Sequence, residues 1–570
     1  MSVLAKNGDA FVLTYDLFSL PTAQHKAGLA GLLLMIDTLN ERKIEPAPVV
    51  EEVSSTGARL SFTRPALGAL FDDLYDSSLQ EVKVKDRRAK EKPKRIEEVE
   101  VTINGKIKKE KKFVYDAVVP TGAFLNCLMP DAGDAYVKLF RDLVWNTLRG
   151  SSPASRQVYR DRANGKPCSL SAKFWSGFEK TLALRKKGKV PVEDISSSMF
   201  IGAEERNAEK VPFLGSFTDN FLLHFWPIVS LIFVPRTLGI ERDREQGLRV
   251  SRSETGFVLS IPEPAELDYF RDDMRAVLKR LDPETRGFRP RASLIDVHEE
   301  GGLEYLYHLA KDKTRNIGDF ECSVYAVELF HLQRDGKRTR HLGAGRIVPN
   351  EYILKDYALV RDEIHNPIFK SIVLRNIMDG ERWYYRFDAA LYHHPMPVFI
   401  SCRNKTPKEV AFLGLDVRGK FRAIKINLAT NAKGGVMDEN VIDDQLSLRI
   451  YRLIQTYVNV RSEEKSGKRY EDFSKQKDAN GHVVYPEEYR ESRERVCSDA
   501  FLAMRGRRGE EFIEYFTGTI CSVPQYMKQE EYTTLGVELI KDWEKIKVLS
   551  MLAMSAHSYL PGNSKNKEEE

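Results

Sequence analysis

The chain of 570 residues contains none of the compact motifs that usually mark an active site. It has no G-x-x-x-x-G-K-[ST] phosphate loop, no G-x-S-x-G nucleophile elbow and no H-E-x-x-H metal helix. His393 and His394 are the only adjacent histidines, and no aspartate follows them directly. The sequence therefore predicts a protein that is not an enzyme and holds no metal or cofactor. A metal-dependent nuclease with dispersed carboxylates is the alternative, because distant groups can converge on folding.

Basic residues give a stronger signal than nucleophiles or acids. Residues 83–112 contain 13 Lys or Arg and six Asp or Glu, so this segment carries +7, whereas the whole chain carries +5. Asn104 and Gly105 tolerate the positive φ of a two-residue turn, which predicts a basic β-hairpin here. The candidate nucleic-acid contacts of this hairpin are Lys106, Lys108 and Lys109.

The register of that hairpin limits its charge. A turn at residues 104–105 places Glu98 opposite Lys111 and Glu100 opposite Lys109, which partly neutralises the second strand. A solvated surface hairpin without a nucleic-acid partner is therefore an equally good interpretation.

A second hairpin is predicted around Asp335 and Gly336. Cations crowd its tip, and Asp335 is the only acid near the turn, so we expect phosphate contacts there. The candidate residues are Arg334, Lys337, Arg338 and Arg340.

Residues 149–168 follow an aromatic-rich helix at 136–148 and have the composition of a loop that ends in a turn. Arginine, lysine and asparagine side chains can read base edges in a duplex groove, and an ordinary flexible surface loop is the alternative. The candidate residues are Arg156, Arg160, Arg162, Asn164 and Lys166.

Helical periodicity dominates the chain after residue 430. Apolar residues repeat at helical spacing over 446–458, 498–516 and 528–560, with a charged loop expected at 461–494. Three arginines on the second helix are candidates to guide a single DNA strand, with a solvated helix face as the alternative. They are Arg505, Arg507 and Arg508.

These elements predict an α+β protein. A mixed α/β N-terminal domain with protruding basic β-hairpins spans 1–430, and an all-α helical bundle spans 437–570. The best-specified element lies at 13–39, where a strand and a turn precede a long apolar helix. Gly28 and Gly31 lower the helix propensity there, which predicts close approach of another backbone.

Two strings of the chain resemble a known family. LTYDLFSLPTAQHKAGLAGLLL, from residue 13, and FLLHFWPIVSLIFVPRTL, at 221–238, are similar to the large subunit of type I CRISPR surveillance complexes (Cascade) of the Myxan type. The resemblance implies that the N-terminal domain holds the 5′ handle of the guide RNA (crRNA) and reads the protospacer-adjacent motif (PAM) in double-stranded target DNA. It also implies that the C-terminal bundle resembles the small subunit and lines the path of the separated strands, which stabilises the R-loop.

The resemblance further implies partners. These are the Cascade backbone and handle-binding subunits, together with a helicase-nuclease for antiviral defence or transposition proteins for RNA-guided transposition. Small-subunit copies are expected from an internal start at Met437, because the codons of Lys433, Gly434 and Gly435 can spell a ribosome-binding sequence. That product would contain 134 residues.

The remaining composition predicts a cytoplasmic protein with no membrane segment. No signal peptide opens the chain, and the most apolar window, 221–234, is shorter than the roughly 20 residues that a bilayer requires. Six scattered cysteines without a close pair indicate reduced thiols rather than a zinc ribbon or a disulfide framework.

Overall fold

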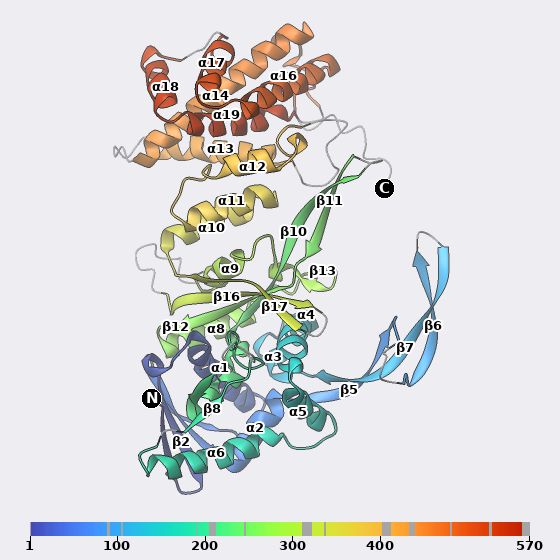
Figure 1. Ribbon diagram of the computed structural model, residues 1–570, viewed down its shortest axis with the longest axis vertical. Coiled ribbons are helices and arrows are strands. Elements are labelled where there is room, and N and C mark those ends of the chain that lie inside the picture. Colours follow the sequence, from blue (N-terminus) through green and yellow to red (C-terminus); the bar gives the residue numbers. More distant parts are fainter. Residues whose placement is uncertain are drawn as a thin grey trace. The chain divides into compact units, whose positions relative to one another are not determined.

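The computed structural model describes residues 2–87, 92–103, 106–189, 191–203, 213–243, 247–310, 322–335, 338–401, 412–431, 439–478, 481–523 and 527–560 (Figure 1). The chain divides into two compact units. The first comprises Met1–Arg236 and Glu254–Glu351, and the second comprises Thr237–Ser253 and Tyr352–Glu570. Strands concentrate in the first and helices in the second, so the predicted α+β class is confirmed.

The first unit opens with the predicted strand, turn and helix. A four-stranded antiparallel sheet has the order β1-β2-β4-β3, and helix α1 follows β2 directly. Thr22 is the N-cap of α1, where its hydroxyl accepts a hydrogen bond from the His25 backbone N–H. The elements are β1 (Val3–Asn7), β2 (Ala10–Asp16), α1 (Ala23–Glu41), β3 (Val49–Ser54), β4 (Gly57–Thr63) and α2 (Arg64–Leu74).

Helix α1 is buried along almost its whole length, and its two glycines explain how. A Cβ on Gly28 would overlap the carbonyl of Leu222, and one on Gly31 would overlap the carbonyl of Phe225. Both carbonyls belong to the apolar stretch that forms the short helices η4 (Phe221–His224) and η5 (Trp226–Val229). The two strings that carry the family resemblance therefore pack against each other, and the predicted close approach is confirmed.

A second sheet of the first unit has the order β5-β7-β6. Glu98 pairs with Lys111 and Glu100 with Lys109, so the predicted register is confirmed, while the turn residues 104 and 105 lie outside the described residues. The strand β5 pairs only with the later part of β7, which leaves β6 and the start of β7 as a two-stranded ribbon. The bounds are β5 (Ser77–Val84), β6 (Arg95–Ile103) and β7 (Lys106–Pro120).

Helices connect this sheet to the buried apolar stretch. The predicted aromatic-rich helix at 136–148 is confirmed, although its second half is wound as a π-helix. The bounds are α3 (Ala123–Leu128), α4 (Gly133–Phe140), η2 (Arg141–Leu148), α5 (Pro153–Ala163), α6 (Ser169–Arg185), β8 (Val192–Asp194), β9 (Leu214–Ser216) and α7 (Phe217–Asn220).

A third sheet has the order β11-β10-β12-β16-β17, with β15 (Leu294–Ile295) beside β10. Helix α9 packs on it through Gly301, where a Cβ would stand 2.9 Å from a methyl group of Val258. The other bounds are β10 (Leu231–Asp243), β11 (Gly247–Glu254), β12 (Phe257–Pro264), α8 (Leu267–Lys279), β13 (Thr285–Arg286), β14 (Arg289–Pro290), α9 (Glu300–Ala310), β16 (Val324–Asp335) and β17 (Arg338–Ile347).

The second unit consists mainly of helices, and the helical part begins well before residue 430. Strand β17 ends at Ile347, and each secondary-structure element described after it is a helix. The boundary predicted between 430 and 437 falls largely on residues 432–438, which lie outside the described residues, so the domain division stays a prediction. The bounds are α10 (Glu351–Glu363), α11 (Pro367–Met378), α12 (Phe387–His393), α13 (Gly414–Asn431), α14 (Glu439–Ser466), α15 (Tyr470–Phe473), α16 (Glu487–Gly506), α17 (Gly509–Tyr515), η8 (Phe516–Ile520), α18 (Gln529–Lys541) and α19 (Trp543–Ser558).

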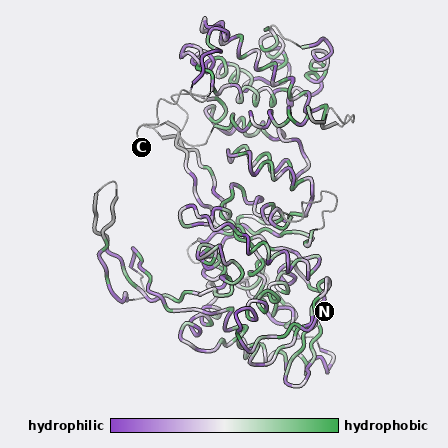
Figure 2. Tube along the Cα trace, turned by 180° about the vertical axis from the view of Figure 1, so that it is seen from behind, coloured by the Kyte–Doolittle hydropathy of each residue, from purple (hydrophilic) through white to green (hydrophobic). Residues whose placement is uncertain are grey.

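Helix α19 lies at the centre of this unit and packs against α13, α14 and α16. Figure 2 shows hydrophobic and hydrophilic residues interleaved along the helices of this unit. The charged loop predicted at 461–494 is wrong at both ends, because α14 extends to Ser466 and α16 begins at Glu487. The Glu, Lys and Arg residues that suggested a loop are good helix formers, and several of them, such as Glu464, Glu487 and Glu491, occupy exposed helical positions.

No described helix combines the length and the apolar character needed to span a bilayer.

Candidate nucleic-acid interface

The segment expected to be a loop around Arg156 is a helix. Residues Pro153–Ala163 form α5, with Pro153 in its first turn, where its missing N–H costs nothing. Val158 and Tyr159 are buried beneath it, and this burial favours the helix over the loop that the polar composition suggested. The predicted turn after it is confirmed, since Gly165 has a φ of +75°.

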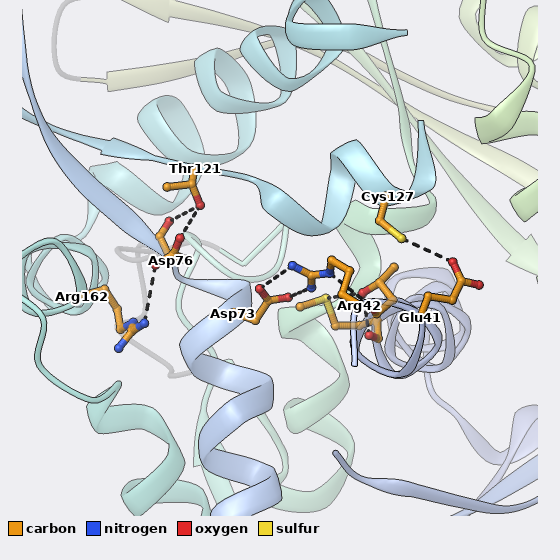
Figure 3. Close-up of polar contacts among 9 residues, drawn as sticks. Glu41, Arg42, Asp73, Asp76, Thr121, Cys127 and Arg162 are labelled. Atoms are coloured by element: carbon orange, nitrogen blue, oxygen red, sulfur yellow. Dashed lines mark hydrogen bonds and ion pairs between the residues drawn. The ribbon is translucent and has the colours of Figure 1, made fainter. Parts of the chain in front are cut away.

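Two arginines of this region form contacts within the protein. The Arg162 guanidinium lies 3.4 Å from Asp72 and 3.5 Å from Asp76, and Asp76 also accepts a hydrogen bond from Thr121 (Figure 3). Arg149 is only 2% exposed, donates to the His224 carbonyl and lies over the Tyr75 ring. Both therefore attach the α5 region to the core.

The other candidates of this segment face solvent. Arg156 and Arg160 are exposed one helical turn apart, which places them on one face of α5. Asn164 is exposed, but its amide donates to the Arg160 carbonyl and caps the helix. The Lys166 side chain is 71% exposed and lies 4.0 Å from Asp161. The structure thus divides the five candidates into one anchor and four exposed residues.

The base of the first ribbon is strongly neutralised. Lys94 and Arg95 both bind Glu81, and their hydrogen bonds lower the pKa of its carboxyl to about 2, with Arg95 the larger influence. Lys83 similarly pairs with Glu97 at 2.5 Å. Lys106, Lys108 and Lys109 lie on β7 opposite Ile103, Val101 and Glu100, and their side chains lie outside the described part of the structure.

In the second predicted hairpin, β16 and β17 pair antiparallel, while the turn residues 336 and 337 lie outside the described residues. Arg334 pairs with Thr339 and Gln333 with Arg340, and the Arg334 and Arg340 side chains are exposed. Lys337 and the Arg338 side chain lie outside the described residues.

The three arginines of the helical unit lie at the junction of α16 and α17 and play different roles. Arg505 donates to the carbonyls of Tyr392 and His394 at 2.9 and 3.1 Å, which ties α16 to the end of α12. Arg507 donates to the Ala503 carbonyl and lies 4.6 Å from the Tyr515 ring. Arg508 is exposed and lies 5.4 Å from the Tyr392 ring. Arg508 is therefore the most accessible of the three.

Sequence reasoning missed two residues beside these arginines, Trp543 and Lys547, which lie there together with Tyr392. The Lys547 ammonium lies 5.4 Å from the Tyr392 ring and 6.0 Å from the Trp543 ring. The sequence does contain a pattern that points to Lys547, because this lysine interrupts the apolar face of a helix whose neighbouring positions are buried. A lysine at such a position usually has a specific partner.

No metal centre appears in the described part of the chain, where no group of three or more His, Cys, Asp or Glu residues is arranged to hold an ion.

Two family models match the chain, one after the other. The type I-B CRISPR Cas8b N-terminal domain matches residues 47–319, and the type I-B CRISPR Cas8b C-terminal domain matches residues 324–557. No curated protein matches the chain. The resemblance to a type I CRISPR large subunit is confirmed by both models, whereas the Myxan type and the fused small subunit stay predictions.

Proposed function

Because the chain belongs to the Cas8b family of type I CRISPR large subunits, we propose that it binds the 5′ handle of the crRNA, recognises the PAM in duplex DNA and stabilises the R-loop. The observation that carries this proposal is the match to both Cas8b domains in chain order. In such a complex the guide reads the target by base pairing, and the protein needs only to read a short motif and to hold the backbone.

Exposed cations support this division of labour. Arg156, Arg160 and Lys166 form an accessible group at α5, and with Asn164 they provide donors suited to phosphates and to base edges. We assign PAM-side contacts to this group and phosphate contacts to the tip of β16 and β17. Arg162 is a positioning residue, because its guanidinium is engaged by Asp72 and Asp76.

The helical unit is proposed to line the path of the separated strands, as the small subunit does. We further propose that additional copies of its last part arise from the internal start at Met437. The remaining partners are the backbone and handle-binding subunits and either a helicase-nuclease or transposition proteins. Whether the neighbouring genes encode a helicase-nuclease or a transposase distinguishes these two alternatives.

Binding and cleavage assays test the proposal against a metal-dependent nuclease. The chain, assembled with crRNA and its partner subunits, is incubated with labelled duplex DNA and magnesium or manganese. We expect shifted but uncut DNA, with an affinity that falls steeply as salt rises. Cleavage that depends on the metal and on a carboxylate of this chain would refute the non-catalytic role, and salt-independent binding would refute the phosphate contacts.

A further inference from the structure

A small pocket of about 220 Å³ lies in the helical unit beside the arginines of α16 and α17. Its walls come from α12, the α16–α17 junction and the first turns of α19. The residues that matter for its chemistry are Tyr392, Arg505, Arg508, Trp543, Glu544 and Lys547. Pockets for whole drug-sized ligands usually occupy about 300–1,000 Å³, so this one suits a smaller group.

Lys547 gives the pocket a buried positive charge. It is 6% exposed and donates to the Tyr392 hydroxyl and to the carbonyls of Arg505 and Arg507, at 2.9, 3.3 and 2.6 Å. All three acceptors are neutral groups, and no carboxylate of the described residues lies within ion-pair distance of this ammonium. A buried charge without a counter-ion is costly, so an anion in the pocket would offset that cost.

Arg508 supplies hydrogen-bond donors that Lys547 lacks. Lys547 spends its three protons on protein oxygens, and Arg505 is engaged by the carbonyls of Tyr392 and His394. Arg508 is exposed at the pocket and has no ion pair with any described carboxylate. Burial alone would raise the pKa of the Tyr392 hydroxyl, but hydrogen bonds from Lys547 and Arg508 lower it, which indicates a positive local field.

Two aromatic rings border the same space. Tyr392 is 41% exposed, Trp543 is partly exposed, and the Lys547 ammonium lies within 6.0 Å of each ring centre. Flat rings beside cations provide a stacking surface for a nucleobase next to a site for its phosphate. Glu544 also lines the pocket, and its carboxylate disfavours a simple anion but accepts hydrogen bonds from a base amino group.

We propose that this pocket binds one nucleotide of single-stranded nucleic acid, with the base stacked against Trp543 and Tyr392 and the phosphate held by Arg508. Lys547 acts on the phosphate through its charge. This proposal rests on the proposed function, because it specifies how the helical unit holds a separated strand. It adds three residues and a base-stacking mode to the phosphate contacts expected from the arginines.

The test uses the full-length chain and two labelled strands of equal length, one an ordinary single-stranded oligodeoxynucleotide and one with every base removed. Trp543→Leu should weaken binding of the ordinary strand about 5- to 100-fold and leave the abasic strand unchanged, because only a base can stack. Arg508→Gln should weaken both strands. Lys541→Ala is the matched control, since this lysine is 74% exposed on α18 and lies outside the pocket.

Crosslinking keeps the test independent of any loss of folding in the variants. Strands that contain 5-iodouracil, irradiated with the unaltered chain, should crosslink to the peptide that carries Tyr392 or Trp543. The pocket proposal would be overturned if Trp543→Leu bound the ordinary strand as tightly as the unaltered chain does, if it weakened both strands by the same factor, or if crosslinks formed only at other peptides. Strand binding by the unaltered chain would stand in each case. Failure of the unaltered chain to bind any strand at low salt would instead count against the proposed function as well.

Discussion

The carbonyl oxygen of Phe225 occupies the space that a side chain on Gly31 would need. This relationship joins two segments almost two hundred residues apart, and it is repeated one turn earlier by Gly28 and the Leu222 carbonyl. The first helix can lie directly against the buried apolar stretch because these two positions have no Cβ. The core of the first unit therefore depends on two residues that weaken the helix when it is considered alone.

The first prediction concerns this close packing. Gly31→Ala should lower the free energy of unfolding by about 1–3 kcal/mol, because the added methyl group forces a backbone shift in a packed core. Gly68→Ala is the control, since Gly68 lies in α2 with open space around its Cβ position and should gain up to about 1 kcal/mol. Thermal and urea unfolding of the full chain measure both, and equal stability of the two variants would contradict the close approach.

The second prediction separates recognition from anchoring around α5. Lys166→Ala or Asn164→Ala should relax the PAM preference at one position without abolishing binding, which a PAM library selection measures. Arg162→Ala should instead lower the unfolding temperature, because Asp72 and Asp76 lose their shared partner. The exposed residues are also replaced one at a time by alanine, namely Arg156, Arg160, Asn164 and Lys166. If none of these variants changes the PAM preference, this segment takes no part in PAM recognition.

The third prediction concerns the tip of β16 and β17. Replacing Arg334, Lys337, Arg338 and Arg340 by alanine should weaken DNA binding similarly for all sequences and reduce the salt slope by about 0.9 for each phosphate that the protein no longer neutralises. Replacement of Lys94 and Arg95 is the control, because these two cations already pair with carboxylates of the protein, namely Glu81, Glu97 and Asp116. Weaker binding of one DNA sequence alone would show base reading rather than phosphate binding.

The fourth prediction concerns the displaced strand. Arg508→Ala should change the permanganate footprint of the strand nearly as much as the triple replacement of Arg505, Arg507 and Arg508, because Arg508 is the accessible member of the three. Arg505→Ala should mainly lower the stability of the helical unit, since Arg505 holds the carbonyls of Tyr392 and His394. A footprint identical to that of the unaltered chain would favour a solvated helix face.

The fifth prediction concerns internal translation initiation at the Met437 codon. Expression of the unaltered gene with a C-terminal tag should yield a short second product that disappears when the Met437 codon is changed while the full-length band persists. That product would lack α13, whose Arg418 donates to the carbonyls of Ala556 and Tyr559, so it should unfold at a lower temperature than the helical part of the full chain. A single full-length band would refute the internal start.

Local patterns in the sequence determined the local elements. The strand, turn and helix at 13–39 follow from apolar patterning and glycine placement, and the β6–β7 register follows from the choice of turn residues. The family could likewise be identified from two apolar strings. The composition was misleading at 149–168 and at 461–494, where charged residues that suggested loops lie on exposed helix faces or anchor a helix.

Tertiary structure alone decided which cations are available to bind nucleic acid and which pair with other groups of the protein. Asp72 and Asp76 engage Arg162 from about ninety residues away, and no local pattern announces that pairing. Lys547 meets Tyr392 across 155 positions of the chain, and Arg505 meets the Tyr392 carbonyl across 113. Sequence spacing fixes neighbours only within a helix or a strand pair, because contacts between elements depend on packing of the whole core. The pocket beside α19 therefore could not be predicted from the sequence and was found only in the folded structure.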